Sequence, residues 1–200
     1  EVYGEDRFHE LYGEIVPIPE ARLLAPEDGA RITLGKRALE LIHTPGHALH
    51  HYCIVDLDHD LVFSGDTFGI SYRDFDVHGR EFIMPTTTPV HFDPDALCAS
   101  VDRLMSYEPQ KIYLTHYSEV RDLERLAREM KDRVQAFADL GRRFRSAPDR
   151  SAKLRKGMYA MLARWLDEHG FPDGDAKRHW LLDDDVELNC QGLEVWLDRA

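Results

Sequence analysis

The sequence has no excess of positive charge and no long hydrophobic run. Its 200 residues carry 25 Lys and Arg against 37 Asp and Glu, which gives a formal net charge of −12. Nucleic acids and anionic membranes are bound by basic surfaces, so we expect neither as a partner. No apolar segment reaches the roughly 20 residues that span a bilayer. A globular protein with one sizeable core remains the expectation.

The sequence is also poor in cysteine. Cys53, Cys98 and Cys190 are odd in number and far apart. They indicate reduced thiols, and without a signal-like segment the expected location is the cytoplasm. No Cys-x-x-Cys pair, glycine-rich phosphate loop or Gly-x-Ser-x-Gly tract occurs, which disfavours three common kinds of site. The chain starts at Glu1 without a methionine, as expected of an internal position in a longer protein.

Alternating apolar residues predict short strands over 31–34, 38–42, 52–57 and 61–64, joined by tight turns. A helix is expected over 94–107, because Asp93 suits the N-cap and Pro94 the first helical position. A further strand is expected over 111–115. Strand, helix and strand in this order predict a layered α/β fold.

The pattern changes to helical after residue 116. Apolar residues at three- and four-residue steps predict one long amphipathic helix from Leu123 to Phe144. Two more helices are expected, over 154–166 and over 176–198, and Gly192 could interrupt the last one. No cluster of reactive side chains occurs in these helices. We therefore predict a domain over 1–120 and a C-terminal helical extension over 121–200 that serves as a cap or packing module.

Three potential metal ligands follow apolar stretches directly. His47, Asp66 and His116 each lie in a turn at the end of an expected strand. Two imidazoles and a carboxylate suit zinc or iron. Each residue also has a simpler interpretation: His47 could hydrogen-bond a backbone carbonyl within its turn, and Asp66 could stabilise an Asx-turn.

The tract Thr44-Pro45-Gly46-His47, then Gly65-Asp66-Thr67, then a histidine after a strand, resembles the metallo-β-lactamase-fold hydrolases over about residues 23–117. The resemblance implies an αββα sandwich with one or two metal ions at one edge. It implies His47 as a ligand of the first metal and His116 as a ligand of the second. It implies Asp66 as the catalytic carboxylate that bridges both.

One motif of that family is missing. None of the 11 histidines belongs to a His-x-His-x-Asp-His tract, and the cluster of His47, His50 and His51 has the wrong spacing. In the family this tract supplies the remaining ligands, so we expect this chain to hold the second half of the fold and an incomplete site. We expect it to be inactive by itself. Its uncovered sheet should favour a homo-oligomer.

The resemblance implies a metal-dependent hydrolase that directs a metal-activated hydroxide at an ester, thioester, lactone or similar small molecule. Two zinc ions are expected in the complete protein, and iron is compatible with the same ligands. Two alternatives stay open: a di-iron protein that handles oxygen or nitric oxide, and a non-catalytic interaction fragment. Residues that could support the ligands or touch substrate are His43, His51, Tyr72 and His91. For these four, simple packing in a strand or loop is the alternative.

Overall fold

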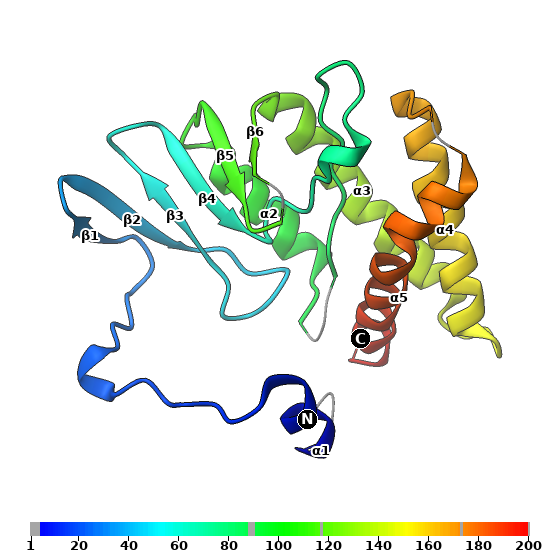
Figure 1. Ribbon diagram of the computed structural model, residues 1–200, viewed down its shortest axis with the longest axis horizontal. Helices are drawn as coiled ribbons and strands as arrows, with labels where there is room; N and C mark the ends of the chain where they lie inside the picture. The colour runs from blue at the N-terminus through cyan, green and yellow to red at the C-terminus, as the bar shows by residue number, and fades with distance from the viewer. Residues whose placement is uncertain (1–4, 88–90, 117, 173, 200) are drawn as a thin grey trace.

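The computed structural model describes residues 5–87, 91–116, 118–172 and 174–199 (Figure 1). Its strands are β1 Ala30–Leu34, β2 Arg37–His43, β3 Tyr52–Asp56, β4 Leu61–Gly65, β5 Lys111–Leu114 and β6 Glu119–Val120. Its α-helices are α1 Glu5–Tyr12, α2 Pro94–Met105, α3 Leu123–Phe144, α4 Arg150–His169 and α5 Asp175–Arg199. Short 3-10 turns occur at Glu20–Arg22 and Arg73–Phe75. The mixed α/β fold expected from the sequence is confirmed.

The six strands form one sheet in the order β1-β2-β3-β4-β5-β6. Strands β1 to β4 pair antiparallel in sequence, β4 and β5 pair parallel, and β5 and β6 pair antiparallel. Consequently β2, β4 and β5 run in the same direction. Their carboxyl ends meet at one edge of the sheet, and the loops that follow these strands are brought together there.

One face of the sheet packs against helices. Its side chains share a single hydrophobic core with α2, which lies behind the strands in Figure 1, and with α3, which runs from beside β6 toward α4 and α5. The fully or almost fully buried members from the strands are Ile42, Cys53, Val55, Val62 and Ile112, and those from α2 are Leu97, Val101 and Leu104. Burial of this apolar face stabilises the sheet and fixes the position of α2 beside the loops at the strand ends.

The opposite face is more open to solvent. Phe63 of β4 is 39% exposed, and its ring stacks on that of Tyr113 from β5 with the centroids 5.2 Å apart. Ile54 is half-buried and Tyr52 is exposed. This face has the apolar and aromatic composition of a surface that would gain stability from being covered.

The C-terminal helices pack in sequence, α3 on α2, α4 on α3 and α5 on α4. Their core is continuous with that of the sheet, because the loop over residues 68–87 inserts aromatic side chains between them. Phe75 in this loop meets Phe171 after α4 with ring centroids 5.2 Å apart. Helix α5 runs through Gly192 without the interruption that the sequence suggested. The C-terminal helices α3, α4 and α5 thus share one core with the loop and the sheet.

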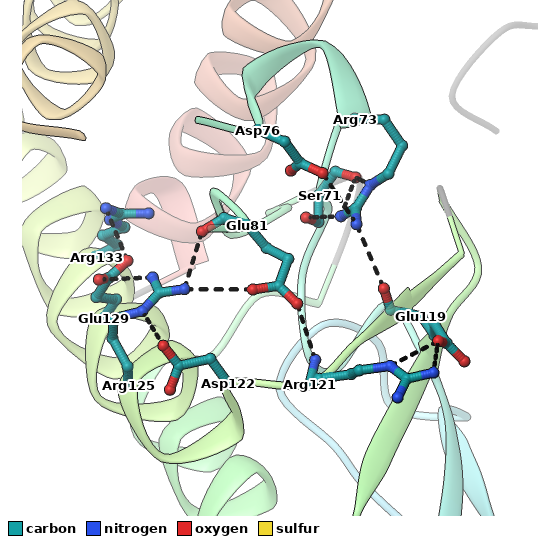
Figure 2. A network of polar contacts seen from close by, with 10 residues as sticks. All are labelled: Ser71, Arg73, Asp76, Glu81, Glu119, Arg121, Asp122, Arg125, Glu129 and Arg133. Atoms are coloured by element: carbon teal, nitrogen blue, oxygen red, sulfur yellow. Dashed lines mark hydrogen bonds and ion pairs between the residues drawn. The ribbon is translucent and has the colours of Figure 1, made fainter. Parts of the chain in front are cut away.

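Charged side chains join the loop to β6 and α3 (Figure 2). Arg125 of α3 contacts the carboxylates of Asp122, Glu129 and Glu81 at 2.6, 3.0 and 3.4 Å. It also donates to the Glu81 carbonyl. The Arg125 side chain is only 14% exposed, so these contacts are partly shielded from water. The network fixes the loop against the end of the sheet.

The segment before β1 lies apart from this body. Helix α1 and the chain that follows it run outside the sheet in Figure 1, and residues 9–28 are exposed. Within the described ranges, no helix combines the length and the hydrophobicity that a membrane span would need.

Candidate metal centre

The three potential ligands come together at the shared strand edge. Nε2 of His47 lies 3.5 Å from Oδ2 of Asp66, and Nε2 of His116 lies 3.5 Å from Oδ1 of the same carboxylate. The side chain of His47 is 10% exposed and that of His116 is 51% exposed. The group is therefore buried on the His47 side and open to solvent on the His116 side.

Helix α2 fixes the loop that carries His47. Gly46 has a φ of +123°, and a Cβ at this position would lie 2.2 Å from the backbone nitrogen of Leu97. The Ser100 hydroxyl donates to the Pro45 carbonyl at 2.7 Å, and the Asp93 amide donates to the Gly46 carbonyl at 2.8 Å. Glycine is thus needed at position 46, because a side chain there would clash with the backbone of α2.

A backbone carbonyl orients the His47 ring. Its Nδ1 lies 3.2 Å from the Thr86 carbonyl oxygen, which can only accept a hydrogen bond. Nδ1 must therefore carry a proton, and in the neutral ring the lone pair is on Nε2, the atom that faces Asp66. This is the tautomer required if Nε2 is to bind a metal.

His51 supports Asp66 from behind. The Asp66 amide donates to His51 Nε2 at 3.0 Å, and His51 Nδ1 lies 3.1 and 3.0 Å from the hydroxyls of Thr44 and Thr67. Burial, with a smaller effect from His47, lowers the pKa of His51 and favours the neutral ring that this bonding needs. His51 thus holds the backbone of Asp66 and is not placed as a ligand.

The thiol of Cys53 lies beneath these residues. It contacts the Thr44 hydroxyl at 3.1 Å and donates to the Ser64 carbonyl at 3.2 Å. Burial raises its pKa to about 11, so it stays protonated near neutral pH. A protonated thiol is a poor metal ligand, which leaves the two imidazoles and the carboxylate as the donors at this edge.

The donors fit a divalent metal in chemistry but are incomplete in number. Asp66 Oδ1 is buried, and no described residue donates a hydrogen bond to it. Two donors each about 2.1 Å from one tetrahedral ion lie about 3.4 Å apart, so the separations match ligands better than hydrogen bonds. Within the described ranges, however, no three His, Cys, Asp or Glu side chains surround one point as a metal site requires. The histidines instead approach opposite oxygens of one carboxylate, as expected for a carboxylate shared between two metal positions.

The other residues singled out from the sequence are dispersed. The His43 ring lies 2.8 Å from the Leu49 carbonyl and closes its own loop. The Tyr72 hydroxyl donates to Asp185 Oδ2 of α5 at 2.6 Å, and burial raises the pKa of Asp185. His91 is half-buried before α2. A substrate contact by His43, Tyr72 or His91 stays a prediction.

Sequence reasoning missed the residues that hold the candidate ligands in place. Thr44 and Thr67 contact His51, and Asn189 of α5 hydrogen-bonds Thr87, next to the carbonyl that orients His47. The threonines flank the ligand motifs but carry no pattern of their own. Asn189 did carry a signal, since it is a polar residue on the apolar stripe of α5, between the buried Val186 and Leu193.

The fold and these motifs define a metallo-β-lactamase-type protein, and comparison with known families agrees. Residues 2–116 match the model of the metallo-beta-lactamase superfamily, and the chain belongs to this family. The family that the sequence motifs suggested is therefore confirmed.

The individual proteins that the chain resembles have low sequence identity to it or match only a short part of it. The chain is 27% identical over 128 residues to the metallo-beta-lactamase fold-containing protein ST1585 of Sulfurisphaera tokodaii, covering 62% of this chain and 45% of that protein. The ST1585 crystal structure superposes with a TM-score of 0.58 at 20% identity, over 96% of this chain and 59% of that one. A short match, 40% identical over 52 residues, relates the chain to the acyl-coenzyme A thioesterase MBLAC2 of Gallus gallus, over 26% of this chain and 18% of that protein.

The Thermus thermophilus protein TTHA1429, of the metallo-beta-lactamase family, superposes with a TM-score of 0.55 at 18% identity. That alignment covers 88% of this chain and 49% of the other. The chain thus spans about half the length of the relatives that it matches over most of its residues.

Proposed function

We propose that this chain provides half of the metal centre of a metallo-β-lactamase-fold hydrolase. His47, Asp66 and His116 are its metal ligands, with Asp66 shared between two metal positions. In this proposal the remaining ligands come from residues that this sequence does not contain.

The observation that carries the proposal is the Asp66 carboxylate between two imidazoles. His47 and His116 approach its two oxygens at 3.5 Å each, and the buried Oδ1 receives no hydrogen bond from the part of the chain that the structure describes. An unsatisfied buried oxygen is costly unless another group, such as a metal ion, compensates it. The Thr86 carbonyl keeps the Nε2 lone pair of His47 directed at the same point.

Bound divalent ions would supply Lewis-acid polarisation of a scissile carbonyl and a water nucleophile at neutral pH. The protein's own contribution is to orient the donors. His51 fixes the backbone of Asp66, α2 fixes the His47 loop, and His116 lies on the side open to solvent. A substrate would therefore enter beside His116.

For the substrate we propose an acyl ester or thioester. The support is the short match to a protein named as an acyl-coenzyme A thioesterase. Zinc is the proposed metal, because two imidazoles with a carboxylate form a common catalytic zinc set, and iron is the alternative with the same donors.

Metal binding by the purified chain tests the ligand assignment. Cobalt(II) titration followed by absorbance, with zinc competition, should show binding that His47→Ala, Asp66→Ala and His116→Ala each weaken at least tenfold. His50→Ala is the matched control, since His50 is an exposed histidine of the same loop and its loss should leave binding unchanged. Equal effects of His50→Ala and His47→Ala would refute the assignment.

An assay of enzymatic activity tests whether this chain holds only half of the metal centre. We expect the chain by itself to hydrolyse thioesters and lactones far more slowly than the usual enzyme rate of about 1 to 1,000 per second. Turnover of about 1 per second would show that these residues suffice and that the proposal of a half-site is wrong.

The identity of the metal is tested separately. Elemental analysis of protein grown with both metals separates zinc from iron, and oxygen or nitric oxide consumption by an iron-loaded chain would favour the redox alternative.

A further inference from the structure

Helix α5 contacts the loop over residues 68–87 at Asn189, in addition to the bond between Tyr72 and Asp185. Asn189 of α5 is 1% exposed, and its side-chain oxygen accepts a hydrogen bond from the Thr87 amide at 2.6 Å. The Thr87 hydroxyl donates to the Asn189 carbonyl at 2.8 Å. The Asn189 amide group donates to the Asp185 carbonyl of its own helix at 2.8 Å, so the orientation of the side chain is fixed.

The bonded Thr87 amide belongs to the same peptide unit as the Thr86 carbonyl. That carbonyl accepts a hydrogen bond from Nδ1 of His47, with 3.2 Å between the nitrogen and the oxygen. One rigid peptide plane is therefore held by Asn189 at its N–H and by His47 at its C=O. Because hydrogen bonds in such a chain polarise one another, the bond to Asn189 also strengthens the acceptor that faces His47.

Gly192, one turn further along α5, lets the loop come this close. A Cβ on Gly192 would lie 2.1 Å from the Thr87 carbonyl oxygen and 2.8 Å from its hydroxyl. A glycine inside a helix is unfavourable by itself, so its presence in α5 needs a local reason. The contact with Thr87 provides one.

Building on the proposed function, we propose that Asn189 and Gly192 of α5 are positioning residues for His47. They fix the peptide between Thr86 and Thr87, and this peptide holds the His47 ring in the tautomer with its Nε2 lone pair toward Asp66. The C-terminal helices thereby take part in the metal centre although they contribute no ligand.

The His47 tautomer can be measured in the metal-free full chain. Long-range 15N–1H spectra at about pH 8, above the ordinary histidine pKa of about 6.5, distinguish protonation at Nδ1 from protonation at Nε2. The signals of His47 are assigned by their loss in His47→Gln. In the unsubstituted chain we expect the Nδ1–H form to dominate, and in Asn189→Ala a mixture with the Nε2–H form.

Two further variants make the result specific. Gly192→Ala should displace Thr87 and shift the same signals, even though alanine favours a helix. Cys190→Ala is the matched control, because Cys190 is a buried neighbour on α5 whose sulfur lies 4.0 Å from that of Met158 in α4, away from the loop. It should lower stability and leave the His47 signals unchanged.

Cobalt(II) affinity is the second readout. Loss of an outer hydrogen bond to a ligating histidine commonly weakens metal binding by about ten- to a hundredfold, and we expect about tenfold for Asn189→Ala. Unchanged tautomer and affinity in folded Asn189→Ala would overturn the proposal. If that variant does not fold, an unchanged tautomer in Gly192→Ala would overturn it, as would an equal shift in Cys190→Ala.

The result of the tautomer measurement can be told apart from the result of the cobalt-binding test of the proposed function. A chain that binds no cobalt would contradict the ligand assignment, while the tautomer measurement would still decide whether α5 orients His47. A chain that binds cobalt with an unchanged tautomer in both variants would keep the ligands and remove the role of α5.

Discussion

The two faces of the sheet are built from alternate residues of the same strands and meet different surroundings. On β5, Ile112 is completely buried against the helices, while its neighbour Tyr113 is half-buried on the other face. On β4, Val62 is completely buried and Phe63 is 39% exposed. Both faces are apolar at these positions, so hydrophobicity alone does not distinguish them.

The difference shows which face of the sheet the helices of this chain cover. The helix-covered face belongs to a continuous core that reaches α5. The open face has stacked aromatic rings and no comparable burial at Phe63 or Tyr113. A sandwich of two layers covers both faces of a sheet, and the chain spans about half the length of its relatives ST1585 and TTHA1429.

Paired substitutions on β5 should give the largest difference between the two faces in the loss of the free energy of unfolding. Ile112→Ala removes a completely buried side chain, and we expect the free energy of unfolding to fall by about 3 kcal/mol. Tyr113→Ala on the open face should cost about 1 kcal/mol, mainly through the stacking on Phe63. Urea unfolding measures both, and equal losses would mean that the two faces are equally buried in solution.

Breaking the charged network around Arg125 should have the next largest effect on the free energy of unfolding. Arg125→Met leaves Glu81, Asp122 and Glu129 without their shared cation, in a partly shielded position. We expect a loss of about 2 kcal/mol in the free energy of unfolding. Arg128→Met, at an exposed position on the same helix, is the control and should change it by less than about 0.5 kcal/mol. Similar values for both variants would contradict a stabilising network.

The open face should also control association. We expect the isolated chain to form oligomers in sedimentation experiments, because exposed apolar and aromatic surface favours self-association. Phe63→Glu should shift the population toward monomer. Leu188→Glu, at a 45% exposed apolar position on α5, is the control and should not. A dispersed monomer that unfolds cooperatively would show that the open face needs no partner.

The smallest effect on stability is expected at Asp28, which precedes the edge strand β1. Asp28 pairs with Arg103 of α2 at 2.9 Å, and this hydrogen-bonded arginine lowers the pKa of Asp28 below its ordinary value of 3.8. Its contribution is therefore present above that ordinary pKa and is lost as the pH falls through the lower folded-state value.

Because the Asp28 side chain is 50% exposed, solvent screening limits this contribution to about 0.5 kcal/mol or less. Asp28→Asn should thus slightly reduce stability at pH 7 and have no effect at a pH below the folded-state pKa. Glu27→Gln, at the exposed neighbouring position, should be neutral at both. Thermal unfolding at the two pH values tests the difference.

The sequence by itself determined most of the elements and the family, although it gave no indication of the short strand β6. Period-two alternation predicted β2, β3 and β4, since each strand has one buried face, and Asp93 with Pro94 marked the start of α2. Three motifs after strands were enough to identify the metallo-β-lactamase superfamily. These signals are local, because hydrophobic period and capping depend on residues close in the chain.

Only the tertiary structure decided how these parts meet. The parallel pairing of β4 with β5 brings Asp66 beside His116, and two successive antiparallel pairings bring the end of β2 to the same edge. The hydrogen bond from Thr87 to Asn189 joins residues 102 positions apart. No local propensity encodes such a contact, because it depends on the packing of α5 against the loop. The sequence thus supplied the candidate ligands, and long-range packing placed the groups that orient them.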